Sequence, residues 1–179
     1  MSGAQVGVRR ARTGDVPAVR ALVDRYAPGG RLLSKPTVTL YEDVQEFFVA
    51  VDATERVVGC GALHVLWSDL AEVRTVAVAP QAQGGGVGSL LLERLLRRAV
   101  DLGVRRVFCL TFETAFFARH GFVPASGVLV DGRVQEELLQ SSDEGVAEFL
   151  DLARVRPNTL GNARMLRLLA DGPGAASGP

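Results

Sequence analysis

Apolar and polar residues alternate, or form short apolar blocks, in four segments of the first eighty residues, and this pattern predicts strands. The segments cover residues 6–10, 47–51, 56–66 and 70–79. A polar turn at residues 52–55 joins the second segment to the third and predicts a hairpin. Pro80 ends the fourth strand, because proline cannot donate a ladder hydrogen bond.

Two longer segments carry apolar residues at helical spacing. The first begins with Asp15 as N-cap and Pro17 in the first turn, and it ends at Pro28-Gly29-Gly30. The second covers residues 86–102. The residues that share an apolar face are Val19, Leu22, Val23 and Tyr26 in the first helix and Val87, Leu91, Leu95 and Ala99 in the second. Residues 31–46 are expected to be a loop that becomes helical near Leu40.

The C-terminal part of the chain has shorter elements. Strands are predicted at residues 106–110, from Phe122 onward and at residues 145–155, and short helices at residues 113–119 and 134–141. Residues 162–170 are regular, with helix and strand both open, and residues 171–179 have the composition of a disordered tail. This order predicts an α/β (α+β) fold, with a mixed central sheet flanked by helices and a single domain over residues 1–170.

Composition narrows the class of protein. The chain has 179 residues, a formal net charge of zero and acids interspersed with bases, so no nucleic-acid partner is expected. No segment is long and apolar enough for a membrane span, and the N-terminus has no signal-peptide pattern, so we expect a cytoplasmic protein. Cys60 and Cys109 lie in apolar runs and are expected to be buried free thiols. With two histidines and no zinc-site spacing, no metal is expected.

The strongest chemical signal is a glycine-rich turn between the fourth strand and the second long helix. Gln83-Gly84-Gly85-Gly86-Val87-Gly88 places backbone N–H groups, with few side chains, at the positive end of a helix. Such a turn favours a phosphate. It is not a Walker A loop, because Ser89 and Leu90 follow Gly88, and no register of it matches G-x-G-x-x-G. A plain glycine-rich turn is the structural alternative.

The pattern Gln83-x-x-Gly86-x-Gly88 resembles the acetyl-CoA pyrophosphate loop of the GCN5-related N-acetyltransferases (GNATs), and His120-Gly121-Phe122 resembles the end of that family's short helix. The resemblance implies the GNAT fold and acetyl-CoA as cosubstrate. It implies that the cofactor contacts are Val76, Ala77, Val78, Gln83, Gly84, Gly85, Gly86, Val87, Gly88, Ser89 and Phe117.

Other segments resemble the N-acetylglutamate synthase type of amino-acid N-acetyltransferase, in its short stand-alone form. The segments are residues 58–64, Glu72, residues 76–78, residues 107–111 and residues 117–122. This resemblance implies transfer of acetyl to glutamate or glutamine, the first step towards arginine. A homodimer stays open. Two alternatives also remain: an acetyltransferase for another small amine or a protein N-terminus, and a non-catalytic acyl-CoA sensor.

Two residues of the fourth strand are candidates for catalysis. The backbone of Val76 can pair with pantetheine and point an N–H at the thioester oxygen. Glu72 is expected on the same strand face as Arg74 and Val76 and can act as general base, although a solvated strand-end charge is an equal alternative. The family tyrosine that protonates the thiolate is replaced by Phe117, and Tyr41 is a remote substitute.

The substrate carboxylate requires fixed positive charge. Lys35, the sole lysine, Arg74 and Arg164 are the candidates, and each could instead be an ordinary surface charge. The resemblance also implies that the segment at Asn162 and the loop near Lys35 border the amino-acid site, and Tyr41 is a further candidate substrate residue. Glu113, expected near Arg74, is a candidate partner for it.

Overall fold

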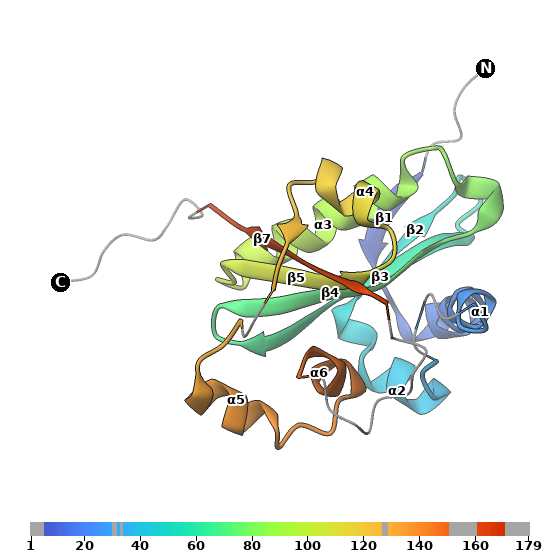
Figure 1. Cartoon of the computed structure of the whole chain (residues 1–179). Coiled ribbons are helices and arrows are strands. Elements are labelled where there is room, and N and C mark those ends of the chain that lie inside the picture. Colours follow the sequence, from blue (N-terminus) through green and yellow to red (C-terminus); the bar gives the residue numbers. More distant parts are fainter. Residues whose placement is uncertain (1–5, 30–31, 33, 127–128, 151–160, 171–179) are drawn as a thin grey trace.

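The computed structural model describes residues 6–29, 32, 34–126, 129–150 and 161–170, and these form a sheet with helices on both faces (Figure 1). The sheet has seven strands in the order β1-β2-β3-β4-β5-β7-β6. Their bounds are β1 Gly7–Arg10, β2 Phe47–Val51, β3 Val57–Trp67, β4 Leu70–Val78, β5 Arg106–Thr111, β6 Val123–Pro124 and β7 Ala163–Leu168. The β4–β5 pair is parallel and the other pairs are antiparallel, so the predicted mixed sheet is confirmed.

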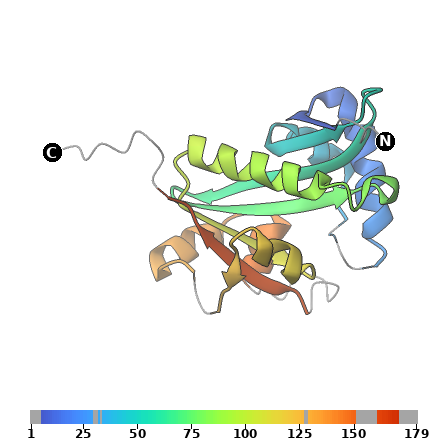
Figure 2. The same ribbon diagram turned by 90° about the horizontal axis from the view of Figure 1, so that it is seen from above.

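The helices divide into two layers. The helix α3 (Val87–Asp101) and the short α4 (Thr114–Arg119) lie over one face, and α1 (Val16–Tyr26), α2 (Thr37–Glu42) and α6 (Glu144–Phe149) lie over the other (Figures 1 and 2). The remaining elements are α5 (Gly132–Leu138) and the 3-10 turns η1 (Thr13–Asp15), η2 (Val44–Glu46) and η3 (Pro80–Ala82). In the described part of the chain, no helix combines the length and apolarity that a membrane crossing requires.

The predicted apolar faces are the buried faces. Val87, Leu91, Leu95 and Ala99 of α3 are each at most 3% exposed and pack on the sheet. On the other face, Val19, Leu22 and Val23 of α1 pack against β2 and β3. Cys60 and Cys109 are free and buried as predicted, and burial raises the pKa of the Cys60 thiol to about 12.

Two C-terminal predictions change. The segment predicted as a strand at 145–155 begins as the helix α6, and its residues 151–155 lie outside the described part. The carboxylate of Asp143 accepts the N–H of Val146 at 3.0 Å, which starts the helix, and the short apolar run did not distinguish helix from strand. The undecided segment 162–170 contains strand β7, and the predicted tail 171–179 lies outside the described residues.

A β-bulge in β4 changes which side chains share a face. Cys60 of β3 is opposite Ala77, but Ala62 is opposite Arg74, so β4 has one extra residue there. The backbone strain of the bulge falls on Thr75, whose φ of 57° lies in the left-handed region. The predicted common face of Glu72, Arg74 and Val76 is therefore wrong for Val76, which packs with the α3 side of the core.

The parallel pairing of β4 with β5 stops early. The last paired residues are Glu72 and Phe108, although β4 continues to Val78 and β5 to Thr111. On its other edge, β5 pairs with β7 along its whole length, from Arg106 to Thr111. The far half of β4 therefore has no β5 partner along one edge, and the candidate site lies there.

Candidate functional site

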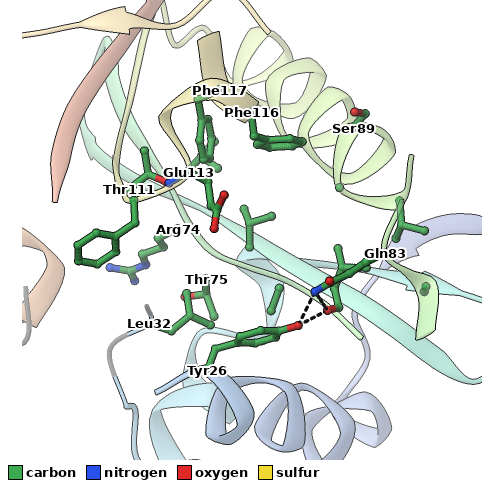
Figure 3. Close-up of a pocket in the computed structure, with 18 of the residues that line it drawn as sticks. Tyr26, Leu32, Arg74, Thr75, Gln83, Ser89, Thr111, Glu113, Phe116 and Phe117 are labelled. Carbon is green, nitrogen blue, oxygen red and sulfur yellow. Dashed lines mark hydrogen bonds between the residues drawn. The ribbon is translucent and has the colours of Figure 1, made fainter. Parts of the chain in front are cut away.

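A cavity of about 590 Å³ lies between the separated ends of β4 and β5 and continues to the glycine turn (Figure 3). Its walls come from α1, β4, the turn before α3, the end of β5 and α4. The lining residues include Tyr26, Leu32, residues 73–78, Ala82, Gln83, Gly84, residues 86–89, residues 110–113, Phe116, Phe117 and Arg119. The predicted cofactor residues line it, except Gly85.

The glycine turn forms one end of the cavity. Gly84 and Gly86 both have φ of 78°, a conformation that L side chains rarely adopt, and Gly86 is the left-handed N-cap of α3. A Cβ added at either would meet no atom within 4 Å, so the space above them is open. The first helical bond runs from Leu90 N–H to Gly86 C=O, which leaves the preceding N–H groups for an anion. The turn therefore fits a phosphate ligand.

Tyr26 fixes the turn to the strand, and the sequence analysis treated it only as a core residue. Its hydroxyl donates to the Val78 carbonyl at 2.5 Å and accepts from the Gln83 amide nitrogen at 2.9 Å (Figure 3). Gln83 was predicted as a cofactor contact. In this structure its amide also connects α1, the end of β4 and the turn.

Aromatic residues of α4 form another wall. The Phe116 and Phe117 rings meet edge to face at 5.2 Å, and Phe117 makes a similar contact with Phe122. A Cβ at Gly88 would lie 3.3 Å from the Phe116 ring, so a small residue is needed where α3 and α4 approach. Phe117 is 5% exposed and has no proton to donate. Phe116 also lines the cavity but was not predicted, because the family pattern points only to the position of Phe117.

A cluster of charged side chains lies on the α1, α2 and α6 face, where Arg74 reaches from the cavity floor. The Arg74 guanidinium is 2.8 Å from Asp143, 3.2 Å from Glu46, 3.5 Å from Asp43 and 3.9 Å from Glu72. We call these five residues, with Lys35 and His64, the acidic cluster. Glu113 is not among these partners, so the expected Arg74–Glu113 pair is wrong.

The acidic cluster is held tightly around the cation. Burial opposes the charge of Arg74, but the nearby Glu72 and Asp143 carboxylates outweigh it and raise the Arg74 pKa. Burial would raise the pKa of Asp143, but Arg74 and His64 lower it to about 2. Both groups therefore remain ionised at neutral pH.

Glu72 is buried at 4% exposure, so the solvated strand-end alternative is wrong. It does not itself line the cavity, but its neighbours Val73 and Arg74 do. A Cβ on Gly145 of α6 would lie 3.1 Å from the Glu72 carboxylate, so only a glycine lets α6 approach this closely.

The other predicted substrate residues lie outside the cavity lining. Lys35 is 3.2 Å from the Asp43 carboxylate that also faces Arg74, so it belongs to the acidic cluster. Tyr41 is 44% exposed on α2. Asn162 and Arg164 are partly buried at the start of β7, where Arg164 is opposite the cavity-lining Leu110.

Among the residues that the structure describes, no three His, Cys, Asp or Glu side chains gather closely enough to hold an ion. The acidic cluster is instead arranged around the guanidinium of Arg74.

Comparison with known proteins gives a consistent result. The model of the acetyltransferase (GNAT) family matches residues 16–122. An amino-acid acetyltransferase of Mycobacterium tuberculosis is 61% identical over 164 residues, which cover 90% of this chain and 94% of that protein. Amino-acid acetyltransferases of Neisseria meningitidis are 35% identical over 68% of this chain, which corresponds to only 28% of their length.

Solved structures agree. A Mycobacterium tuberculosis protein in complex with CoA and NLQ superposes with a TM-score of 0.88 at 60% identity, covering 92% of this chain and 99% of that one. N-acetylglutamate synthase of Neisseria gonorrhoeae, complexed with coenzyme A and N-acetyl-glutamate, gives a TM-score of 0.73 at 28% identity. That alignment covers 93% of this chain and 36% of the synthase.

Proposed function

The chain belongs to the acetyltransferase (GNAT) family, with acetyl-CoA as cosubstrate, and from that premise we propose that it acetylates the α-amino group of L-glutamate or L-glutamine. The observation that carries the proposal is 61% identity to an amino-acid acetyltransferase over nearly the full length of both chains. In this proposal the enzyme catalyses the first step towards arginine, and residues 1–170 form one acetyltransferase domain.

Acetyl-CoA binds, in this proposal, through backbone groups. The N–H groups at the start of α3 hold the pyrophosphate, and the unpaired edge of β4 hydrogen-bonds the pantetheine amides as another strand would. Val76 follows the bulge at Thr75 and lines the cavity, so its N–H is the proposed donor to the thioester oxygen. The bulge reorients the backbone at the point where the thioester must be polarised.

Glu72 is the proposed general base. The acceptor amine must lose its ammonium proton before it can attack the thioester. Glu72 is the buried carboxylate 3.9 Å from the guanidinium of the cavity-lining Arg74, and α6 keeps it away from bulk solvent through Gly145. One bridging water would extend its reach to the amine.

The amino-acid carboxylate is the proposed ligand of the remaining cationic donors. Arg74 is 9% exposed, and its buried Nε has no hydrogen-bond acceptor among the residues that the structure describes, although both terminal nitrogens are occupied. A substrate carboxylate would satisfy it. Lys35 and Arg164 lie near this part of the cavity. Lys35 pairs with Asp43, which faces Arg74, and Arg164 is opposite the cavity-lining Leu110.

A second acceptor class has an observation in its favour. The acidic cluster contains four carboxylates and two fixed cations, Arg74 and Lys35. A site next to net negative charge also attracts amines that have no carboxylate, such as polyamines.

A substrate panel tests the proposal. Release of CoA thiol from acetyl-CoA is measured with glutamate, glutamine, other amino acids, a polyamine and a peptide N-terminus. Fastest release with glutamate or glutamine is expected. Faster release with the polyamine would overturn the amino-acid assignment, and no release with any amine would favour the acyl-CoA sensor.

A further inference from the structure

Acetylation of an ammonium group leaves one proton to be removed in each turnover, and this inference rests on the proposed function. The protonated amine and the thioester become an amide, a thiol and a free proton. The nitrogen loses two protons as the N–C bond forms and the C–S bond breaks, and the leaving thiolate takes back one. The other proton must reach solvent from the general base.

The proposed base has little direct access to solvent. The Glu72 side chain is 5% exposed, with Arg74 beside it and Gly145 of α6 over it. A carboxylate that keeps the proton cannot serve the next turnover. A second titratable group, closer to solvent, is therefore needed next to Glu72.

His64 occupies that position. It is the register partner of Glu72 on the neighbouring antiparallel strand β3, which puts the two side chains on one face with Cβ atoms about 5 Å apart. The His64 side chain is 19% exposed, so it lies between the buried carboxylate and solvent. Histidine is the side chain best suited to gain and lose a proton near neutral pH.

Two carboxylates orient the His64 ring. Its Nδ1 is 2.7 Å from Glu46 of η2, and its Nε2 is 4.0 Å from Asp143 at the start of α6. Glu46 and Asp143 also bind the two terminal nitrogens of Arg74, so both carboxylates are fixed. Beyond Arg74 lie Asp43 and Lys35, which complete the charged groups around the ring.

Three other groups near Glu72 in the described part of the chain cannot carry the proton. The pKa of Asp143 is about 2, so Asp143 stays ionised during turnover. The raised pKa of Arg74 keeps the guanidinium charged. The Cys109 thiol, on the β5 side, is buried and its pKa is raised, so it does not ionise.

We propose that His64 accepts the substrate-derived proton from Glu72, directly or through one water, and passes it to solvent. Glu46 and Asp143 are positioning residues that hold the ring across from Glu72. The role requires a basic group at this position and not only a packed ring.

Chemical rescue of His64→Ala tests the role. The variant is assayed with whichever amine gives the fastest thiol release, so that an error in the substrate assignment does not affect the result. We expect kcat to fall about tenfold or more, with the KM for acetyl-CoA little changed. Added imidazole should restore much of kcat, because the His64 site is partly exposed and admits a small base.

The control is pyrazole, which has the same shape but is a far weaker base and should not rescue. Imidazole should also leave the wild-type enzyme unaffected. Wild-type kcat in His64→Ala would overturn the proposal. A loss of kcat that neither added imidazole nor a higher pH reverses would also overturn it. Such a loss would indicate a structural role for His64, and a lower melting temperature of the variant would identify that role. No thiol release by the wild type with any amine would overturn the proposed function and this inference together.

Discussion

The two ends of the cavity are built in opposite ways. The proposed phosphate end consists of backbone from one continuous segment, the glycine turn and the first turn of α3. The proposed acceptor end is bordered by the acidic cluster, whose side chains come from both sides of α2, from η2, β3 and β4, and from just before α6. Arg74 is the member of the cluster that lines the cavity. A backbone site follows from local sequence, whereas a side-chain cluster exists only once the whole chain has folded.

The largest effect is expected from a substitution that disrupts the proposed phosphate end. Gly86→Asp puts a carboxylate at the proposed pyrophosphate position and a side chain at φ of 78°, so CoA binding should be lost. The matched control is Gly103→Asp, at φ of 81° at the other end of α3 and equally open. It carries the same backbone strain without the ligand. Calorimetry of CoA binding compares the two, and equal affinities would remove the phosphate role of the turn.

The next largest effect is expected from a substitution that disrupts the proposed acceptor end and leaves the phosphate end intact. Glu72→Gln keeps the shape of the side chain and removes its basicity, so kcat should fall about a hundredfold or more at neutral pH. The loss should shrink at high pH, where the amine is already neutral. Affinity for CoA should not change. A variant with wild-type kcat across the pH range would end the assignment of Glu72 as base.

The third prediction concerns the cationic residues that are proposed to bind the substrate carboxylate. Lys35→Ala and Arg164→Ala should each cost about 2 kcal/mol of binding, roughly a thirtyfold rise in KM for the amino acid, with little change in KM for acetyl-CoA. Arg94→Ala, on the exposed side of α3, removes the same charge away from the cavity and should alter neither KM. Equal effects of Lys35→Ala on both substrates would indicate a structural role within the acidic cluster.

The smallest expected effect tests the link between the two ends. Tyr26→Phe removes the hydroxyl that joins the Val78 carbonyl to the Gln83 amide. One hydrogen bond contributes about 1 kcal/mol, so CoA should bind roughly fivefold more weakly. Tyr41→Phe, the same change at an exposed tyrosine, is the control. A titration that gives equal CoA affinities for both variants would show that Tyr26 does not order the turn.

The same contrast explains what the sequence could predict. The strands, the two long helices and the glycine turn depend on periodicity and on residues close together in the chain, and the structure has them. The acidic cluster joins Glu46 and His64 to Asp143, which lies 79 positions beyond His64 in the chain, so no local pattern indicates it.

Two errors have local causes. The predicted strand face of Val76 is wrong because one extra residue at Thr75 interrupts the two-residue period of the strand. No sequence signal marks this bulge. The prediction of a strand from residue 145 is wrong where α6 begins, because a short apolar run fits both a helix and a strand, and the Asp143 cap selects the helix.

Isotope labelling tests the central claim most directly. The enzyme is supplied with acetyl-CoA carrying ¹³C at the acetyl carbonyl and with glutamine or glutamate carrying ¹⁵N at the α-amino group, and the product is followed by NMR. The account predicts a carbonyl signal split by one-bond coupling to the α-nitrogen, formed at the rate of thiol release. Two results would contradict it: thiol release that yields only free acetate, or a product without the ¹³C-acetyl group on the α-nitrogen.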